Sequence, residues 1–306
     1  MSGVGGDRPL LSIVVVAYDM ARELPRTLRS LDARYQDGME AADYELIVVD
    51  NGSPTPVDPG LVSELEVATR LIRIDPATPS PAPAVNRGLE LAAGDLIGVF
   101  VDGARLASPG LLRGAMLARR LSDRPVIAAL GWHLGDDTHM RAAATGHDRV
   151  VEDAMLAAIG WPRDGYRLFE ISVLAGSSAR GWFGPLGESN SLFLQREAWD
   201  ALGGFDERFV SPGGGRANSD AYRRACELDG SQLVVLLGEG TFHQIHGGSA
   251  TSGGDGRERA DVEYRSIRGV DWRPPDPPAL FVGTMPDSAL PHLERSVRWR
   301  LRRAHR

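Results

Sequence analysis

The sequence predicts an α/β fold built on a doubly wound, mixed but mainly parallel sheet with helices on its faces. Strand-like and helix-like segments alternate through the first part of the chain, and such alternation favours a parallel sheet. Aspartates follow the ends of three predicted strands, at Asp19, Asp50 and Asp102. Ligands of such sheets bind beyond the carboxyl ends of the strands. These side chains therefore mark a candidate binding edge.

The first elements are defined by their apolar patterns. Leu10–Ala17 and Glu45–Val49 are short continuous apolar runs, typical of strands buried on both faces. Between them Leu24, Leu28 and Leu31 recur at helical spacing. We expect further strands at Arg70–Ile74 and Leu96–Val101, and helices at Ala84–Ala93 and Ser108–Leu121.

The second part of the chain, from about Trp132, is less regular and richer in glycine and aromatic residues. Its Gly-rich loop at Ser211–Gly215 leads into a predicted helix, and Ser249–Gly256 has the composition of a mobile loop. We expect helices near Val150–Ile159, Gln195–Leu202 and Ser219–Leu228, a strand at Leu233–Leu237, and an Arg-rich tail at Arg295–Arg306.

Composition excludes several classes of protein. The net charge of −7 over 306 residues argues against a nucleic-acid binder. No apolar run approaches the ~20 residues that span a bilayer, no N-terminal signal pattern is present, and the single cysteine, Cys226, suits a reducing compartment. We therefore expect a cytoplasmic protein. The sequence contains no lysine, which excludes a Walker-type phosphate loop and a lysine Schiff base.

Four segments, taken in order, resemble the inverting family 2 glycosyltransferases of GT-A fold. Ser12-Ile-Val-Val-Val-Ala-Tyr-Asp19 is similar to the opening strand of that family, and Tyr44-Glu-Leu-Ile-Val-Val-Asp-Asn-Gly-Ser53 to its second strand. Phe100-Val-Asp-Gly-Ala104 stands in the register of its metal-binding D-x-D. Leu202-Gly-Gly-Phe-Asp-Glu-Arg-Phe209 is similar to its acceptor-side Gly-Gly-Phe-Asp motif.

The resemblance implies a site for a nucleotide-diphosphate sugar. Asp50 corresponds to the aspartate that binds the nucleotide base, and a carboxylate can accept a hydrogen bond from a base N–H; in isolation, Asp50 could equally cap a turn. The residues expected to contact the donor are Ala17, Tyr18, Asp19, Asp50, Asn86, Arg87, Asp102, Gly103 and Arg105.

The resemblance also implies a divalent cation, Mn²⁺ or Mg²⁺, but Ala104 stands where the family has its second aspartate. Asp102 then supplies one carboxylate, and His243 and His246 are further candidate ligands because relatives often use a histidine there. Imidazole beside carboxylate suits Mn²⁺ better than Mg²⁺. Arg105 is a rival cation, since guanidinium pairs with phosphate.

The general base is the second departure from the family. The register places Ala217-Asn218 at the family's Glu-Asp pair, and a neutral amide cannot take up the acceptor's proton as a carboxylate can. Asp220 is the first candidate for a displaced base, and Glu188 is the second.

These observations predict one GT-A domain followed by a tail. Residues 1–130 form the donor half, 131–248 the acceptor and catalytic half, and 249–306 a loop and an Arg-rich helical tail. The expected activity is sugar transfer onto a glycan, a lipid-linked or a small-molecule acceptor, and the resemblance implies that the transfer inverts the anomeric centre. The alternatives are a transferase-like binding or scaffold protein and a sugar nucleotidyltransferase. The tail could also touch an anionic membrane surface.

Overall fold

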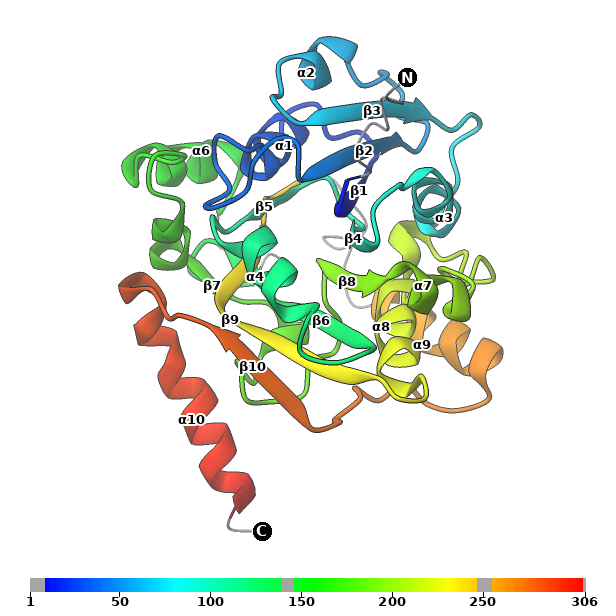
Figure 1. Ribbon diagram of the computed structural model, residues 1–306, viewed down its shortest axis with the longest axis vertical. Helices are drawn as coiled ribbons and strands as arrows, with labels where there is room; N and C mark the ends of the chain where they lie inside the picture. Colours follow the sequence, from blue (N-terminus) through cyan, green and yellow to red (C-terminus); the bar gives the residue numbers. More distant parts are fainter. Residues whose placement is uncertain (1–8, 139–145, 247–254, 305–306) are drawn as a thin grey trace, which may run out of the picture.

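The computed structural model describes residues 9–138, 146–246 and 255–304. One mixed sheet runs through the molecule in the strand order β10-β9-β6-β8-β4-β1-β2-β3, with β5 paired to β9 and β7 to β6. Figure 1 shows this sheet extending from β3 at the top to β10 at the bottom, with helices on both sides. The predicted α/β class and the mixed, mainly parallel sheet are confirmed.

The first half follows the predicted alternation closely. Strands β1, β2, β3 and β4 are mutually parallel where they pair, with β1 between β2 and β4. The elements are β1 (Leu11–Ala17), α1 (Leu24–Leu31), β2 (Tyr44–Asp50), α2 (Pro59–Ser63), β3 (Ala68–Arg73), α3 (Ala82–Leu91) and β4 (Leu96–Phe100).

Alternate residues of the central strands face two separate cores. Ile13 and Val15 of β1 pack toward α1 and α4, whereas Val14 and Val16 pack toward α3 and the second half of the chain. Every residue of β1 is buried. This double burial explains why these strands are continuous apolar runs rather than alternating ones.

The chain after β4 contains strands that the sequence analysis missed. Its elements are β5 (Arg105–Ala107), α4 (Leu111–Ala118), β6 (Pro125–Leu134), α6 (Arg149–Ala158), β7 (Ser172–Leu174), β8 (Leu192–Gln195), α7 (Arg196–Leu202), α8 (Ala217–Glu227), β9 (Gln232–His243), α9 (Asp255–Arg268), β10 (Ala279–Gly283) and α10 (Leu290–Ala304). The missed strands are β5, β6, β7, β8 and β10. Three of them, β5, β7 and β8, span only three or four residues each, too few to show a period. Strands β6 and β10 span ten and five residues and were not recognised.

The strand predicted at Leu233–Leu237 is longer than expected. It continues through Gly238, whose φ is +70°, and the pairing of β9 with β6 shifts register between Ala128 and Leu130. A glycine in this conformation is a bulge rather than a strand end. The extension carries β9 to His243.

The tail forms α10, which Figure 1 shows on the outer side of β10, and its Ser296 is buried and accepts from the Trp182 amide at 2.9 Å. Residues 249–254 of the predicted loop lie outside the described residues, and the last two, Asp255 and Gly256, instead begin α9. In the part of the chain that the structure describes, no helix is long and apolar enough to cross a bilayer. The membrane contact of the tail stays a prediction, as does the domain boundary at 130, which falls inside β6.

Candidate active site

The parallel strands β1, β2 and β4 bring the predicted residues of the nucleotide side to one sheet edge. The amide of Asn51 donates to the Ala17 carbonyl at 2.8 Å, and the amide of Asp19 donates to Ser53 Oγ at 3.0 Å. The loops after β1 and β2 are thus joined directly. Tyr18 and Asp19 are exposed beside them.

Asp50 ends β2 with its carboxylate held by its own loop. Oδ1 accepts from the Ser53 amide at 2.8 Å, and Oδ2 accepts from Arg73 at 2.6 Å and from the Val57 amide at 3.3 Å. Burial alone would raise the pKa of Asp50, but these hydrogen bonds lower it. Asp50 is therefore an ionised residue that fixes the loop. Arg73 was missed because its predicted strand gave no reason to single it out.

The loop after β4 carries Asp102 close under the end of β1. A side chain on Gly103 would meet Ala17 Cβ at 3.1 Å and the Val16 carbonyl at 3.2 Å, so only a glycine allows this approach without displacement. Ala104 is fully buried, and its amide donates to Asp102 Oδ1 at 2.9 Å. The residue in the place of the second aspartate therefore packs inside the protein and orients the first one.

Asp102 Oδ2 faces two imidazoles. It lies 2.8 Å from His243 Nε2 and 3.6 Å from His246 Nε2, and the two histidine nitrogens are 3.0 Å apart. One ligand atom from each residue lies within 4.8 Å of the others. These three side chains, here called the Asp-His-His cluster, form a possible metal-binding site, and the sequence predicted all of them.

The protonation states of Asp102 and His243 suit a cation, whereas His246 must lose its proton before it can bind one. Burial would raise the pKa of Asp102, but the charge and hydrogen bonds of His243 and His246 hold it well below its usual range. Burial lowers the pKa of His243 to about 4, with Arg105 adding to the effect. Burial also opposes protonation of His246, but its hydrogen bond and attraction to Asp102 raise its pKa overall. Ionised carboxylate and neutral imidazole are the metal-binding forms.

The extension of β9 explains how the histidines reach Asp102. Beyond the bulge, β9 pairs antiparallel with β5, with His243 opposite Arg105. The amide of Gln244 then donates to the Ala104 carbonyl at 2.8 Å. The end of β9 is therefore fastened to the Asp102 loop.

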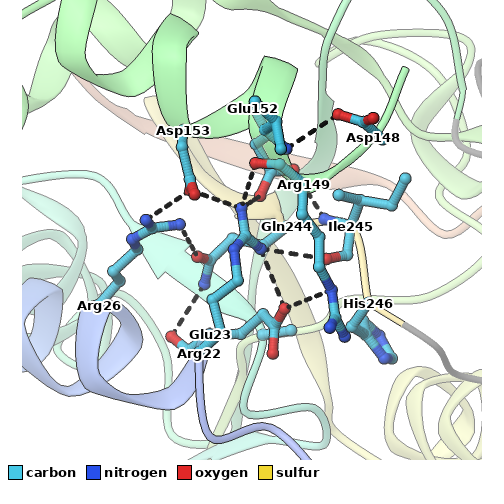
Figure 2. Close-up of polar contacts among 12 residues, drawn as sticks. Arg22, Glu23, Arg26, Asp148, Arg149, Glu152, Asp153, Gln244, Ile245 and His246 are labelled. Carbon is cyan, nitrogen blue, oxygen red and sulfur yellow. Dashed lines mark hydrogen bonds and ion pairs between the residues drawn. The ribbon is translucent and has the colours of Figure 1, made fainter. Parts of the chain in front are cut away.

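A charged network, not predicted from the sequence, fixes the residue before His246. Glu152 Oε2 accepts from the Ile245 amide at 2.7 Å, and Arg22 Nη1 donates to the Ile245 carbonyl at 3.3 Å. Arg22 also pairs with Glu152 at 3.1 Å and with Asp153 at 2.6 Å. Figure 2 shows Arg22 among these carboxylates, directly beside Ile245. Both backbone polar groups of Ile245, which follows the end of β9, are thus bound by side chains from other segments of the chain.

Glu188 lies at the same edge as Asp102. Strand β8 runs antiparallel to β4 with Leu192 opposite Val99, so the chain entering β8 passes beside the residues that follow β4. Glu188 is half-buried and accepts from Ser219 Oγ at 3.1 Å. Asn218 donates from Nδ2 to Asn190 Oδ1 at 3.2 Å. The start of α8 therefore faces this edge through Asn218 and Ser219.

Asp220 is placed differently. It is 1% exposed, and both carboxylate oxygens are used: Oδ1 pairs with Arg268 at 2.6 Å, and Oδ2 pairs with Arg268 at 2.7 Å and with Arg224 at 2.8 Å. Because both oxygens already accept hydrogen bonds from guanidinium groups, neither is free to contact an acceptor hydroxyl. The geometry thus favours the second predicted base, Glu188, over the first.

Two of the predicted donor contacts have other partners. Asn86 donates to the Phe205 carbonyl at 3.0 Å and to Glu207 at 2.7 Å, which ties α3 to the Gly-Gly-Phe-Asp segment. Arg87 pairs with Glu90 at 2.7 Å on the exposed side of α3. The structure does not bring these two side chains into contact with the Asp-His-His cluster, so their donor role stays a prediction.

The comparison with protein families agrees with this site. Residues 12–141, which include β1, β2 and Asp102, match the family described as Glycosyl transferase family 2. The chain carries a domain of glycosyl transferase family 2. The matched segment ends before β8, α8, His243 and His246.

Two curated relatives have the same name. The chain is 30% identical over 226 residues to validoxylamine A glucosyltransferase of Streptomyces hygroscopicus subsp. jinggangensis, a match covering 70% of this chain and 51% of that protein. The enzyme of that name from subsp. limoneus is also 30% identical, with 48% of its length covered. The chain spans about half the length of these relatives.

Solved structures share the fold. S. aureus TarS (residues 1–349, in complex with UDP-GlcNAc) aligns with a TM-score of 0.52 at 12% identity over 83% of this chain and 66% of that one. The mannosyltransferase PcManGT from Pyrobaculum calidifontis, in complex with GDP-Man and Mn²⁺, aligns with a TM-score of 0.53 at 17% identity over 88% of this chain and 66% of that one. The GT-A arrangement implied by the sequence is thereby confirmed.

Proposed function

We propose that this family 2 chain is a glycosyltransferase that moves a sugar from a nucleotide-diphosphate donor to an acceptor hydroxyl. The observation that carries the proposal is the Asp-His-His cluster at the strand edge that also holds the Asp50 loop. Donor complexes of proteins with this fold hold UDP-GlcNAc and GDP-Man. The sequence relatives are named as glucosyltransferases.

The donor would lie along the strand ends. We propose that the loops of Tyr18, Asp19 and Asp50 receive the nucleoside and that the Asp-His-His cluster holds a divalent cation beside the diphosphate. Such a cation, when bound, neutralises the charge that develops on the leaving diphosphate. We propose Mn²⁺, because the site offers two imidazoles and one carboxylate, and because the related mannosyltransferase structure contains Mn²⁺.

We assign the general base to Glu188. Its carboxylate takes the proton of the acceptor hydroxyl, and the acceptor oxygen forms the new bond to the anomeric carbon. The bond from that carbon to the β-phosphate oxygen breaks, and its electron pair leaves with the nucleoside diphosphate. Attack opposite the leaving group inverts the anomeric centre. Support for Glu188 comes from its half-buried carboxylate, with only the Ser219 hydroxyl donating to it among the described residues.

A transferase-like binding protein remains the second candidate. Ala104 and Asn218 replace two family carboxylates, and Asn218 is engaged with the amide of Asn190. A protein of this kind would bind the donor without transferring the sugar.

The first prediction separates these candidates with UDP-glucose, GDP-mannose and dTDP-glucose as donors and water as the acceptor. We expect at least one donor to release its nucleoside diphosphate when Mn²⁺ is present. Glu188→Gln should lower the rate by about 100-fold or more while donor affinity, measured by calorimetry, stays within about twofold. Glu170→Gln, which alters an exposed pair with Arg167, is the control. A donor that binds but is cleaved only after Asn218→Asp would support the binding protein instead.

A further inference from the structure

Arg105 is a buried cation that lacks the hydrogen bonds such a group normally makes. It lies in β5 and is 8% exposed. Among the described residues, its Nε and Nη1 atoms are buried and have no hydrogen-bond partner. Its Nη2 lies 3.7 Å from Asp102 Oδ2, which is an ion-pair separation but too long for a hydrogen bond.

Asp102 does not complete the environment of Arg105. The Asp102 oxygens already accept from Ala104 and contact His243 and His246 at shorter distances. A guanidinium presents five N–H donors in a fixed plane, and burying it without bidentate pairing costs stability. Arg105 is therefore prepared for an anion that the described part of the protein does not supply.

The charge balance of the site indicates which anion. Asp102 and Arg105 carry opposite charges and cancel one another. A divalent ion bound to the cluster would then leave the site with a charge of about +2, whereas a second carboxylate at position 104 would have reduced it. A diphosphate carries two or more negative charges and oxygens that match a guanidinium.

We propose that Arg105 binds the diphosphate of the donor and acts as a permanent cation beside the metal site. It thereby compensates for the weaker metal binding that follows from the missing carboxylate ligand at Ala104. The proposal rests on the donor site described under the proposed function. When the bond from the anomeric carbon to the β-phosphate oxygen breaks, the electron pair moves onto that oxygen. The guanidinium then donates to a more negative acceptor, which stabilises the departing group.

A purely structural Arg105 would behave differently on substitution. If its only role were to balance Asp102, its removal would destabilise the fold and leave anion binding unchanged. If it awaits a ligand, replacing it with an apolar side chain of similar length should leave the stability of the unliganded protein equal or higher, because functional sites store such unfavourable burial.

The experiment measures binding of inorganic pyrophosphate by calorimetry with a chelator present, together with the thermal midpoint of each unliganded protein. The wild-type chain should bind pyrophosphate without metal. Arg105→Met should weaken that binding about 10- to 100-fold, the effect expected for lost charged hydrogen bonds, without lowering the thermal midpoint. Arg105→Lys should retain part of the affinity, because it keeps the charge but loses the planar donor set.

Arg196 provides the matched control. It is also partly buried with an unpartnered Nε among the described atoms, but Nη2 donates to the Ala92 and Gly94 carbonyls at 2.8 and 2.6 Å, at the opposite edge of the sheet. Arg196→Met should lower the thermal midpoint and leave pyrophosphate affinity unchanged.

Three results would overturn the assignment: no pyrophosphate binding by the wild type without metal, unchanged affinity in Arg105→Met, or a thermal midpoint that falls in Arg105→Met as it does in Arg196→Met. Failure of the proposed function is distinguishable. A chain that transfers no sugar but loses pyrophosphate affinity with Arg105→Met supports the anion site alone. A chain that transfers sugar equally well with Arg105→Met retains its function and loses this inference.

Discussion

At the scale of single residues, the two oxygens of Asp102 have separate tasks. Oδ1 accepts the amide of Ala104, which fixes the carboxylate, and Oδ2 faces both imidazoles. One oriented oxygen and two nitrogens can hold a cation in part, and substrate oxygens and water must complete its coordination. We therefore expect metal binding to depend on the nucleotide more strongly than in a site with two carboxylates.

The second prediction tests this site by electron paramagnetic resonance of Mn²⁺ in the presence of UDP or GDP. His246→Ala should weaken Mn²⁺ binding at least tenfold, since a ligand is lost from a site with few others. The affinity for Mn²⁺ should also decrease as the pH is lowered through the raised pKa of His246, because the protonated imidazole cannot bind a metal. His292→Ala is the control, because the His292 ring donates from Nε2 to the Phe169 carbonyl and lies outside the cluster. Equal Mn²⁺ affinity in His246→Ala and the wild type would remove His246 from the ligand set.

Sequence patterns identified the residues of this cluster but not their surroundings. Asp102 was predicted from its place at a strand end and from its register with the D-x-D of the family that the sequence resembles. His243 and His246 were predicted because members of that family often use a histidine there. The partners of Asp50 and Ile245 were not, because Arg73, Arg22 and Glu152 look like ordinary charges of an amphipathic surface. Only the folded chain shows that Glu152 is fully buried and bonded to a backbone amide.

At the scale of elements, β9 and α6 form one unit near the site. Helix α6 contributes Glu152 to the segment just after β9, and Arg22 from the turn before α1 joins the two. Burial raises the pKa of Glu152 to about 7, although Ile245, Arg22 and Arg26 act in the opposite direction. Two acidic neighbours of Arg22, Glu23 and Asp153, share its charge.

The third prediction follows from this raised pKa. The unfolded chain ionises Glu152 near 4.5 and the folded chain near 7, so the folded state binds more protons between those values. The stabilisation that protonated Glu152 gives the folded state is fully present below about pH 4.5 and is lost as the pH rises through 7. Glu152→Gln removes this loss. The free energy of unfolding of the variant relative to wild type should therefore increase from pH 5 to pH 8, by on the order of 3 kcal/mol.

Urea unfolding at both pH values measures this difference. Glu239→Gln is the matched control, because burial raises the pKa of Glu239 also to about 7. Glu239 accepts hydrogen bonds from the hydroxyls of Ser108 and Tyr166, whereas Glu152 accepts one from the Ile245 amide beside the metal site. Both variants should show the same sign of pH dependence, but only Glu152→Gln should also weaken Mn²⁺ binding. A relative stability of Glu152→Gln that does not change with pH would show that Glu152 is ionised throughout.

The elements divide sharply into those that could be predicted and those that could not. Long buried strands such as β1 and β2, and helices with a clear apolar face such as α1, follow from local sequence. Strand β8 is short, and it runs antiparallel between β4 and β6. Its place depends on contacts with residues distant in sequence, which no local pattern contains. The extension of β9 was missed because Gly238 resembles a strand end.

At the scale of the whole molecule, the two halves meet across β4, β8 and β6. The donor edge is built by the parallel strands of the first half, and the second half returns β8, α8 and the end of β9 to the same edge. The α/β alternation predicted the first half of this arrangement. It could not predict that α9 closes the second half by ion pairs to α8, since these involve residues far apart in the chain.

The fourth prediction concerns that closure. Arg268 of α9 pairs with Asp220 of α8 at 2.6 Å and with Asp206 at 2.7 Å, while Arg224 pairs with Asp220 at 2.8 Å. Asp220→Asn would leave two partly buried guanidiniums with reduced pairing, so we expect a loss of roughly 2 kcal/mol in the free energy of unfolding. Donor affinity, and the rate of donor cleavage by the folded protein, should change little.

The same variant discriminates between the two candidate bases. Urea unfolding gives the stability of Asp220→Asn, and donor cleavage is measured well below its thermal midpoint so that only folded protein contributes. Arg223→Gln, which breaks an exposed-side pair with Glu227 on the same helix, controls for a general effect on α8. If Asp220→Asn instead kept its stability and lost turnover as Glu188→Gln is expected to, then Asp220 would be the base. Its guanidinium partners would then have to separate from it when the acceptor binds.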